Sequence, residues 1–206
     1  MERPTGGYLR QAGLTPTKMT IKTDISRFDI HDELTAPEGS AKILRGIQSA
    51  GGSVAKFVGV LAGSPAALRA FTRMRHELRG GKLPAPTRER IALAVAERRG
   101  DPYSLAQHAK TARAAGLGLD EITQARNFQS ADRREAALLA FLEGVLSTDG
   151  RPATHLVEEA REVGWDDEEL LEAVAHVALN EFQSLISNAA ALPHDQSDPT
   201  ILPAAA

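Results

Sequence analysis

The sequence predicts an all-α protein, a helical bundle of about eight to nine helices in one domain. Alanine and leucine predominate, and aromatic residues make up only 4% of the 206 residues. Small side chains on good helix formers favour closely packed helices over a sheet. No stretch of five or more residues alternates polar and apolar side chains as a strand would, whereas apolar residues recur at helical spacing between glycine and proline signals.

The N-terminal third is expected to pass from flexible chain into helices. Residues 1–36 lack a helical period, which predicts a flexible lead followed by an arm from about residue 26, with translation beginning at Met1 or Met19. The first helices are expected over residues 38–50, 54–62 and 64–79. Serine followed by proline opens the third of these, and that pair is a helix cap with proline at the first helical position.

The central segment is predicted to hold a buried helix over residues 87–99. Its centre, Ile91–Ala96, consists of six consecutive apolar residues, a run that fits either a buried strand or a buried helix. A cap at Thr87, the alanine content and the flanking charges favour the helix. Asp101 followed by proline then predicts a further helix to residue 115, which Gly116 ends.

Four more segments complete the expected bundle. Helices are predicted over residues 120–128, 131–146, 153–163 and 166–191, and the last is apolar on most sides, so we expect it to cross the core. The helical domain is therefore expected to span residues 37–192, with a loose tail over residues 193–206.

Composition limits the classes of function. A net charge of -3 gives no electrostatic case for nucleic-acid binding. No apolar run approaches the ~18 residues of a membrane span, and the N-terminus shows no secretory signal, so a cytoplasmic location without membrane contact is expected. The sequence contains no cysteine, which excludes disulfides, thiolate metal sites and cysteine nucleophiles.

The most informative segment runs Glu89-Arg-Ile-Ala-Leu-Ala-Val-Ala-Glu-Arg-Arg-Gly-Asp101-Pro-Tyr-Ser104-Leu-Ala-Gln-His108. It resembles the signature of the alkylhydroperoxidase AhpD-like and carboxymuconolactone decarboxylase superfamily, and the likeness covers roughly residues 37–190. In AhpD-type members a glutamate precedes a Cys-x-x-Cys-x-x-x-His element by twelve residues. Glu89 and His108 match the glutamate and the histidine, whereas Asp101 and Ser104 stand at the two cysteines. Tyr103 fits a position that is often aromatic or histidine.

This departure bears directly on the expected chemistry. The family's peroxidases attack the peroxide with a thiolate, which this sequence cannot supply. The resemblance to the decarboxylase branch implies a small-molecule enzyme that applies acid–base chemistry to a lactone or carboxylate. A non-catalytic descendant that binds a ligand or partner is the alternative, and a cysteine-independent peroxidase using a bound metal or cofactor is the third. The resemblance also implies a homo-oligomer.

The resemblance and the helical spacing together nominate the site residues. Glu89 is expected to be partly buried with a raised pKa suited to proton transfer, or else to complement the helix dipole. His108 lies one turn after Ser104 on the same helix face, where a base near a hydroxyl is expected. Asp101 is either a helix cap or part of the site, and Tyr103 either offers its hydroxyl to a pocket or lies at a subunit contact.

The last predicted helix carries a polar stripe. His176, Asn180 and Ser184 recur every four residues on an otherwise apolar cylinder, so they either complete a site beside His108 or form a buried hydrogen-bond network. Nothing in the spacing of Glu89, His108 and His176 selects a metal site. The sequence therefore predicts neither a metal nor a cofactor, and a small molecule as substrate or ligand.

Overall fold

The structure is a computed structural model that describes residues 26–50 and 52–194. The predicted N-terminal lead, the choice between Met1 and Met19, and most of the predicted tail lie outside the described residues. The boundaries predicted for the helical domain, at residues 37 and 192, fall inside them.

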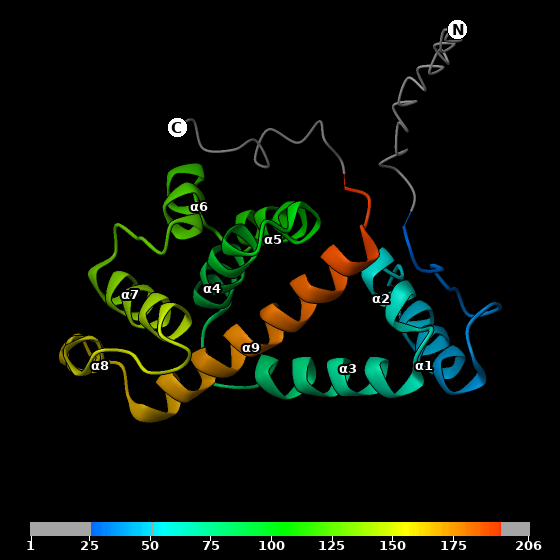
Figure 1. The fold of residues 1–206 in the computed structure, drawn as a ribbon, viewed down its shortest axis with the longest axis horizontal. Helices are drawn as coiled ribbons and strands as arrows, with labels where there is room; N and C mark the ends of the chain where they lie inside the picture. Colours follow the sequence, from blue (N-terminus) through cyan, green and yellow to red (C-terminus); the bar gives the residue numbers. More distant parts are fainter. Residues whose placement is uncertain (1–25, 51, 195–206) are drawn as a thin grey trace, which may run out of the picture.

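The described residues form nine α-helices and no strand, which confirms the all-α prediction (Figure 1). Every helix boundary lies within two residues of the predicted one. The helices are α1 Glu38–Ser49, α2 Lys56–Leu61, α3 Pro65–Arg79, α4 Ala85–Arg98, α5 Pro102–Ala114, α6 Leu119–Arg126, α7 Arg133–Ser147, α8 Thr154–Glu162 and α9 Asp167–Ala190.

Two predicted caps are confirmed and one is wrong. The Asp101 carboxylate accepts the Ser104 N–H at 3.1 Å, and the side chain at residue 64 caps α3 in the same way. Thr87 is not a cap, because α4 already begins at Ala85, behind a proline that presets helical φ. Its hydroxyl instead donates to Glu135 of α7 at 2.6 Å. Glu89 therefore lies beyond the first turn of α4, where the helix dipole does not account for it.

Helices α4 and α9 organise the core. Every residue of Ile91–Ala96 is buried, as predicted for a buried helix, and α4 packs against α5, α6 and α9. Helix α9 crosses the molecule from the yellow α7–α8 end to the cyan α2–α3 end (Figure 1). Its residues Val177 and Leu179 enter two different apolar clusters of the core. The predicted crossing helix is confirmed, and it brings polar residues of α9 beside both α3 and α4.

The predicted arm is tied to two helices. The Arg27 N–H donates to the Ala190 carbonyl at 2.7 Å, and the His31 N–H donates to the Gly59 carbonyl at 3.0 Å. A Cβ at Gly59 would lie 2.7 Å from Ile30 Cγ2, so glycine permits this close approach. The arm therefore covers α2 and the end of α9.

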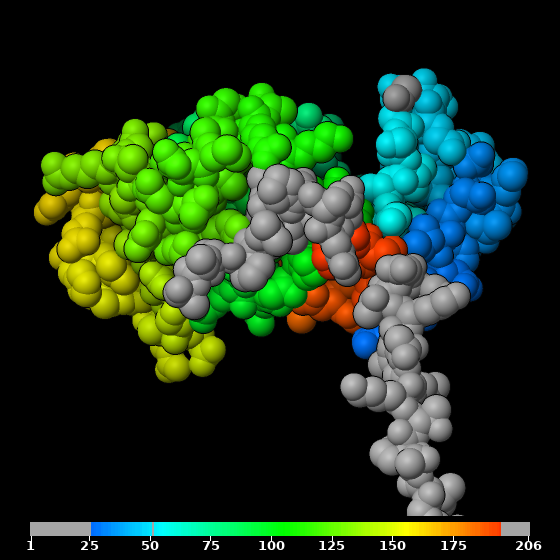
Figure 2. Space-filling model, turned by 90° about the horizontal axis from the view of Figure 1, so that it is seen from above, coloured from blue at the N-terminus to red at the C-terminus, as the bar shows by residue number. Residues whose placement is uncertain are grey.

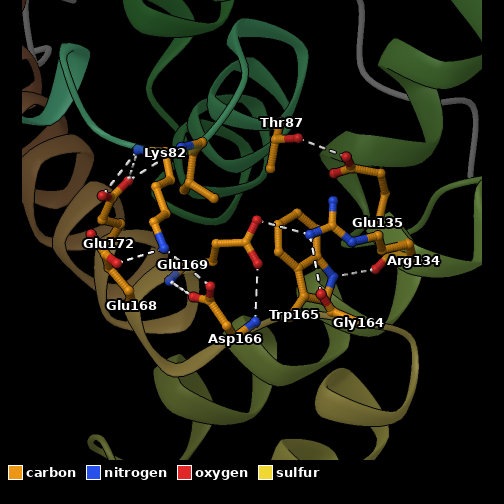
Figure 3. Close-up of polar contacts among 11 residues, drawn as sticks. Lys82, Thr87, Arg134, Glu135, Gly164, Trp165, Asp166, Glu168, Glu169 and Glu172 are labelled. Atoms are coloured by element: carbon orange, nitrogen blue, oxygen red, sulfur yellow. Dashed lines mark hydrogen bonds and ion pairs between the residues drawn. The ribbon is translucent and has the colours of Figure 1, made fainter.

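A polar network fixes the connection between α3 and α4 (Figure 3). The Glu172 carboxylate of α9 accepts the Lys82 N–H at 2.8 Å and the Leu83 N–H at 3.2 Å. The Lys82 ammonium pairs with Glu168 at 2.6 Å. A Cβ at Gly81 would approach the Glu172 carboxylate to within 2.4 Å. A side chain at position 81 would thus require the Glu172 carboxylate to shift from the position in which it accepts these N–H groups.

Glu172→Ala is expected to destabilise the fold by about 1–2 kcal/mol, because two backbone N–H groups lose their carboxylate acceptor. Urea denaturation followed by circular dichroism measures this loss. Glu168→Ala is the matched control, since it removes only an exposed ion pair worth less than about 1 kcal/mol. Equal stability of the two variants would show that Glu172 does not hold the connection.

Candidate active site

A cavity of about 480 Å³ opens between α2, α3, α4, α5 and α9. Figure 2 shows the cyan segment around α2 standing apart from the green segments of α4 and α5. A volume of this size is typical of small-molecule sites. Apolar side chains form part of the wall, and polar or charged ones form the rest. The apolar part includes Phe57, Val58, Phe71, Ala92 and Leu179.

Glu89 and His108 form a hydrogen-bonded pair in this wall. His108 Nδ1 lies 2.9 Å from Glu89 Oε2, and the two side chains are 19% and 21% exposed. The Thr111 hydroxyl donates to the same Glu89 oxygen at 2.6 Å. A proton on Nδ1 that donates to the carboxylate leaves Nε2 as the basic nitrogen. The predicted glutamate and histidine are thus brought together.

Gln183 of α9 links His108 to Ser104. Its Nε2 donates to the Ser104 hydroxyl oxygen at 3.0 Å and lies 3.4 Å from His108 Nε2. The prediction that Ser104 and His108 share one helix face is confirmed, but Ser104 does not line the cavity. The serine therefore supports the amide that faces the histidine.

The expected raised pKa of Glu89 is wrong in direction. Burial raises this pKa, but the hydrogen bond and charge of His108, the Thr111 hydroxyl and the charge of Arg75 together bring it below its ordinary value. Glu89 is partly buried as predicted, yet its neighbours stabilise the carboxylate. The group suited to take a proton is therefore His108, and Glu89 stabilises the imidazolium that results.

Of the neighbouring residues Tyr103 and Asp101, only Tyr103 lines the cavity. Tyr103 lines the cavity, and its hydroxyl oxygen accepts the Phe57 N–H at 3.2 Å, which leaves its own proton available. Burial, offset in part by that N–H and reinforced by the Asp101 charge, raises the pKa of Tyr103 and keeps the proton on the oxygen. Asp101 is fully buried, caps α5 and does not line the cavity.

The polar stripe of α9 lies partly in the site. His176 and Asn180 are buried and line the cavity, whereas Ser184 is buried outside its wall. The Asn180 amide donates to the His176 carbonyl one turn earlier at 2.8 Å. His176 Nε2 is buried and has no hydrogen-bond partner among the described residues. Burial and the charge of Arg88 lower the pKa of His176, against the opposing Leu78 carbonyl, Glu172 and Glu89.

The lowered pKa predicts that stability decreases on acidification. The unfolded chain binds a proton at His176 near the ordinary value of 6.5, and the folded chain binds it only at lower pH. The contribution of His176 is therefore fully present above pH 6.5 and is lost as the pH falls through the lower folded pKa.

Urea denaturation at several pH values between about 5 and 8 measures this slope. His176→Gln is expected to flatten it, whereas His155→Gln, at an exposed position of α8, is the control and should leave it unchanged. Parallel curves for wild type and His176→Gln would contradict the assignment.

Several cavity residues were not predicted from the sequence. Gln183 lies seven residues after His176, so the polar stripe of α9 continues into it, and Thr111 follows His108 by three residues. These helical spacings were a usable signal. Three arginines also line the cavity, and their positions gave no such signal. They are Arg75, Arg79 and Arg88.

Within the described part of the chain, no group of three or more histidine, aspartate or glutamate side chains is arranged to hold a metal ion. Glu89, His108 and His176 thus line one cavity without forming a metal-binding cluster. None of the described helices is long and apolar enough to cross a membrane.

Comparison with known proteins finds a family that part of the chain resembles. Residues 65–147 match the model of the carboxymuconolactone decarboxylase family, a region that contains α3 to α7, including Glu89 and His108. No curated protein matches the chain.

Solved structures share the fold. A crystal structure described as an alkylhydroperoxidase AhpD core, an uncharacterized peroxidase-related protein from Ralstonia eutropha JMP134, has a TM-score of 0.71 and 23% identity, covering 86% of this chain and 95% of that one. An uncharacterized peroxidase-related protein from Silicibacter sp. TM1040 has a TM-score of 0.70 and 19% identity, covering 89% and 96%.

A cysteine-to-alanine variant of the debrominase Bmp8, in complex with 2,3,4-tribromopyrrole, has a TM-score of 0.64 and 18% identity, covering 78% of this chain and 88% of that one. At these identities the likeness to the three structures concerns the fold. Together with the family match over residues 65–147, it shows an AhpD-like fold that contains a segment similar to the carboxymuconolactone decarboxylase family, in a sequence without cysteine.

Proposed function

We propose that this chain is a small-molecule enzyme that applies acid–base chemistry to a lactone or carboxylate, with His108 as the base. The observation that carries the proposal is the 2.9 Å contact between His108 Nδ1 and Glu89 Oε2 in the wall of the cavity. A histidine held by a carboxylate at one nitrogen presents the other nitrogen in its basic form. The match of residues 65–147 to the carboxymuconolactone decarboxylase family supports the reaction class. Acid–base chemistry also needs no cysteine, and the sequence has none.

The proposed step removes a proton from carbon next to a carbonyl group. The C–H bond breaks, the proton moves to His108 Nε2, and the electron pair moves onto the carbonyl oxygen, which becomes an enolate oxygen. The Glu89 carboxylate stabilises the imidazolium. The Tyr103 hydroxyl, which faces the cavity with its proton in place, donates a hydrogen bond to the oxygen on which charge develops.

The second proton movement completes the reaction. In exchange, the proton on His108 is first replaced from the solvent, and His108 then returns a solvent-derived proton or deuteron to the same carbon. In isomerisation it returns the proton to another carbon. Gln183 lies beside His108 Nε2 and contacts Ser104, so its amide is positioned to orient the carbonyl group of the substrate. Ser104 is in this scheme a positioning residue.

Hydrogen exchange into simple carbonyl compounds of the proposed substrate class tests the proposal. The full chain is incubated in deuterated water with levulinate and a carboxylated γ-butyrolactone, both of which carry a C–H bond next to a carbonyl group, and proton NMR follows deuterium incorporation and product formation. We expect exchange or isomerisation of at least one probe above the rate without protein. A chain that binds these probes and transforms none of them contradicts the proposal.

That outcome would favour the second candidate, a non-catalytic protein that binds a ligand in the same cavity. The observation in its favour is that the two residues at the family's cysteine positions, Asp101 and Ser104, do not line the cavity. No reactive group thus takes the place of the thiols. In this case the probes raise the melting temperature without being transformed.

A homo-oligomer in the cytoplasm belongs to the same proposal. The side chains of Leu171 and Leu185 on α9 are 72% and 58% exposed in the single chain, and exposed leucines on a long helix support its pairing with another copy. Light scattering after size-exclusion chromatography tests the oligomer: a monomeric mass contradicts it.

A further inference from the structure

Three arginines face the cavity without acidic partners. Arg75 and Arg79 lie one turn apart on α3, and Arg88 lies on α4. Among residues 26–50 and 52–194, no carboxylate forms an ion pair with any of them. The Arg88 guanidinium donates only to the Arg79 carbonyl, at 2.9 Å. The cluster is thus open to an anion from outside the chain.

The charge in the cavity wall is unbalanced. Glu89 is the only acidic residue among the described residues that line the cavity, and it is already paired with His108. Three arginines against one glutamate leave an excess of two positive charges when the histidines are neutral. Like charges one turn apart on a helix repel each other. A bound anion relieves this repulsion.

Other arginines of the same region show the contrast. Arg90, two residues after Arg88 and therefore on the opposite side of α4, lies 2.7 Å from a Glu121 carboxylate oxygen. Arg126 of α6 lies 2.7 Å from Glu97. The fold therefore supplies carboxylates to arginines that hold helices together, and it supplies none to the three that face the cavity.

Electrostatic effects show that the arginines share one space with the proposed base. The charge of Arg75 acts on Glu89, the partner of His108, and contributes to its lowered pKa. The charge of Arg88 acts on His176 and contributes to the lowered pKa of that histidine. The three arginines and both histidines line the same cavity.

A buried histidine and an apolar surface lie in the same cavity. The His176 side chain is 6% exposed, its Nε2 has no partner among the described residues, and it lines the cavity. Phe57, Phe71 and Leu179 line the same cavity with apolar surface. A ligand that matches the arginines and the apolar surface carries a negative charge at one end and an apolar body at the other.

We propose that Arg75, Arg79 and Arg88 bind the anionic group of an organic oxyanion whose apolar body contacts Phe57 and Phe71. Planar guanidinium groups bind carboxylate and phosphate oxygens through paired hydrogen bonds, so the proposed class of ligand includes both carboxylates and phosphates. The inference rests on the proposed function, because it names the class of substrate that is brought to His108.

Binding of simple probes tests this separately from catalysis. NMR titrations of the full chain with hexanoate, its uncharged analogue hexanamide, and inorganic phosphate give dissociation constants. The double variant R75Q/R79Q is expected to bind hexanoate at least about tenfold more weakly than wild type, because each lost charge-assisted hydrogen bond costs about tenfold or more in affinity. R73Q removes one charge from an exposed position of the same helix that does not line the cavity, and should bind as wild type does.

Each outcome has a distinct meaning. Displacement of hexanoate by phosphate identifies a general oxyanion site, and hexanoate binding that phosphate does not displace identifies a carboxylate site. Equal binding of hexanoate and hexanamide, equal binding by R75Q/R79Q and wild type, or no binding of either anion overturns the proposal. Arginine-dependent binding of hexanoate without any hydrogen exchange would overturn the proposed function alone.

Discussion

His108→Gln is expected to lower the rate of hydrogen exchange by about 10²- to 10⁴-fold, the range for loss of a positioned general base. Glutamine keeps a polar side chain of similar reach beside Glu89 and Gln183 but cannot hold the transferred proton. The histidine is 19% exposed and belongs to none of the apolar clusters, so the variant should fold. Initial rates by NMR, with circular dichroism as a check of helicity, measure the effect.

Glu89→Gln tests whether the carboxylate acts through the histidine. The amide oxygen still accepts from His108 Nδ1, but the negative charge that stabilises the imidazolium is lost. We expect the rate to fall by about tenfold to a hundredfold, less than for His108→Gln. Because Glu89 is a positioning residue that acts through His108, the pH–rate profile of Glu89→Gln should also differ from that of wild type.

His155→Gln is the control for both variants, because it removes a histidine from an exposed position of α8. Wild-type rates in His108→Gln would remove His108 from the mechanism. A rate loss in Glu89→Gln without any change in the pH–rate profile would show that the glutamate acts through packing and not through the charge state of the histidine.

The helices could be predicted from sequence because their signals are local. Asp101 with Pro102 begins α5, and Gly116 follows α5 in the left-handed conformation with φ +95°. Such caps and turns depend on a few neighbouring residues. The cap predicted at Thr87 is wrong for two reasons. A proline directly before Ala85 sets the start of the helix two residues before Thr87, and the Thr87 hydroxyl donates to Glu135 of α7 instead. That second partner is 48 residues away along the chain.

The candidate site could be predicted from the sequence only in part. Glu89 and His108 stand at family positions, and the structure brings them into contact. The direction of the Glu89 pKa depends on Thr111 and Arg75 as well as on burial. Arg75 comes from α3, a different helix, and its neighbours in sequence do not reveal which way it faces. To predict the charge balance of the cavity, one would thus have had to know how α3 packs against α9.

Trp165→Ala is expected to destabilise the fold by about 3–5 kcal/mol, the cost of emptying a large buried aromatic site. Trp165 is 2% exposed and packs in the apolar cluster shared by α4, α7, α8 and α9. Its indole N–H donates to the Arg134 carbonyl at 2.7 Å, and the Arg134 guanidinium lies 3.5 Å from the ring centroid (Figure 3). Domains of this size have only about 5–15 kcal/mol of stability, so the loss is a large part of the total.

Trp165→Phe separates packing from the polar contacts. Phenylalanine keeps an aromatic ring over the Arg134 guanidinium but leaves the Arg134 carbonyl without its donor, so we expect a loss smaller than that of Trp165→Ala. Urea denaturation followed by the circular dichroism of the helices compares the two variants. Equal losses would place the stabilisation in the indole N–H. Since Trp165 directly precedes the Asp166 cap of α9, a larger loss in Trp165→Ala would mean that apolar packing fixes the helix that carries His176, Asn180 and Gln183.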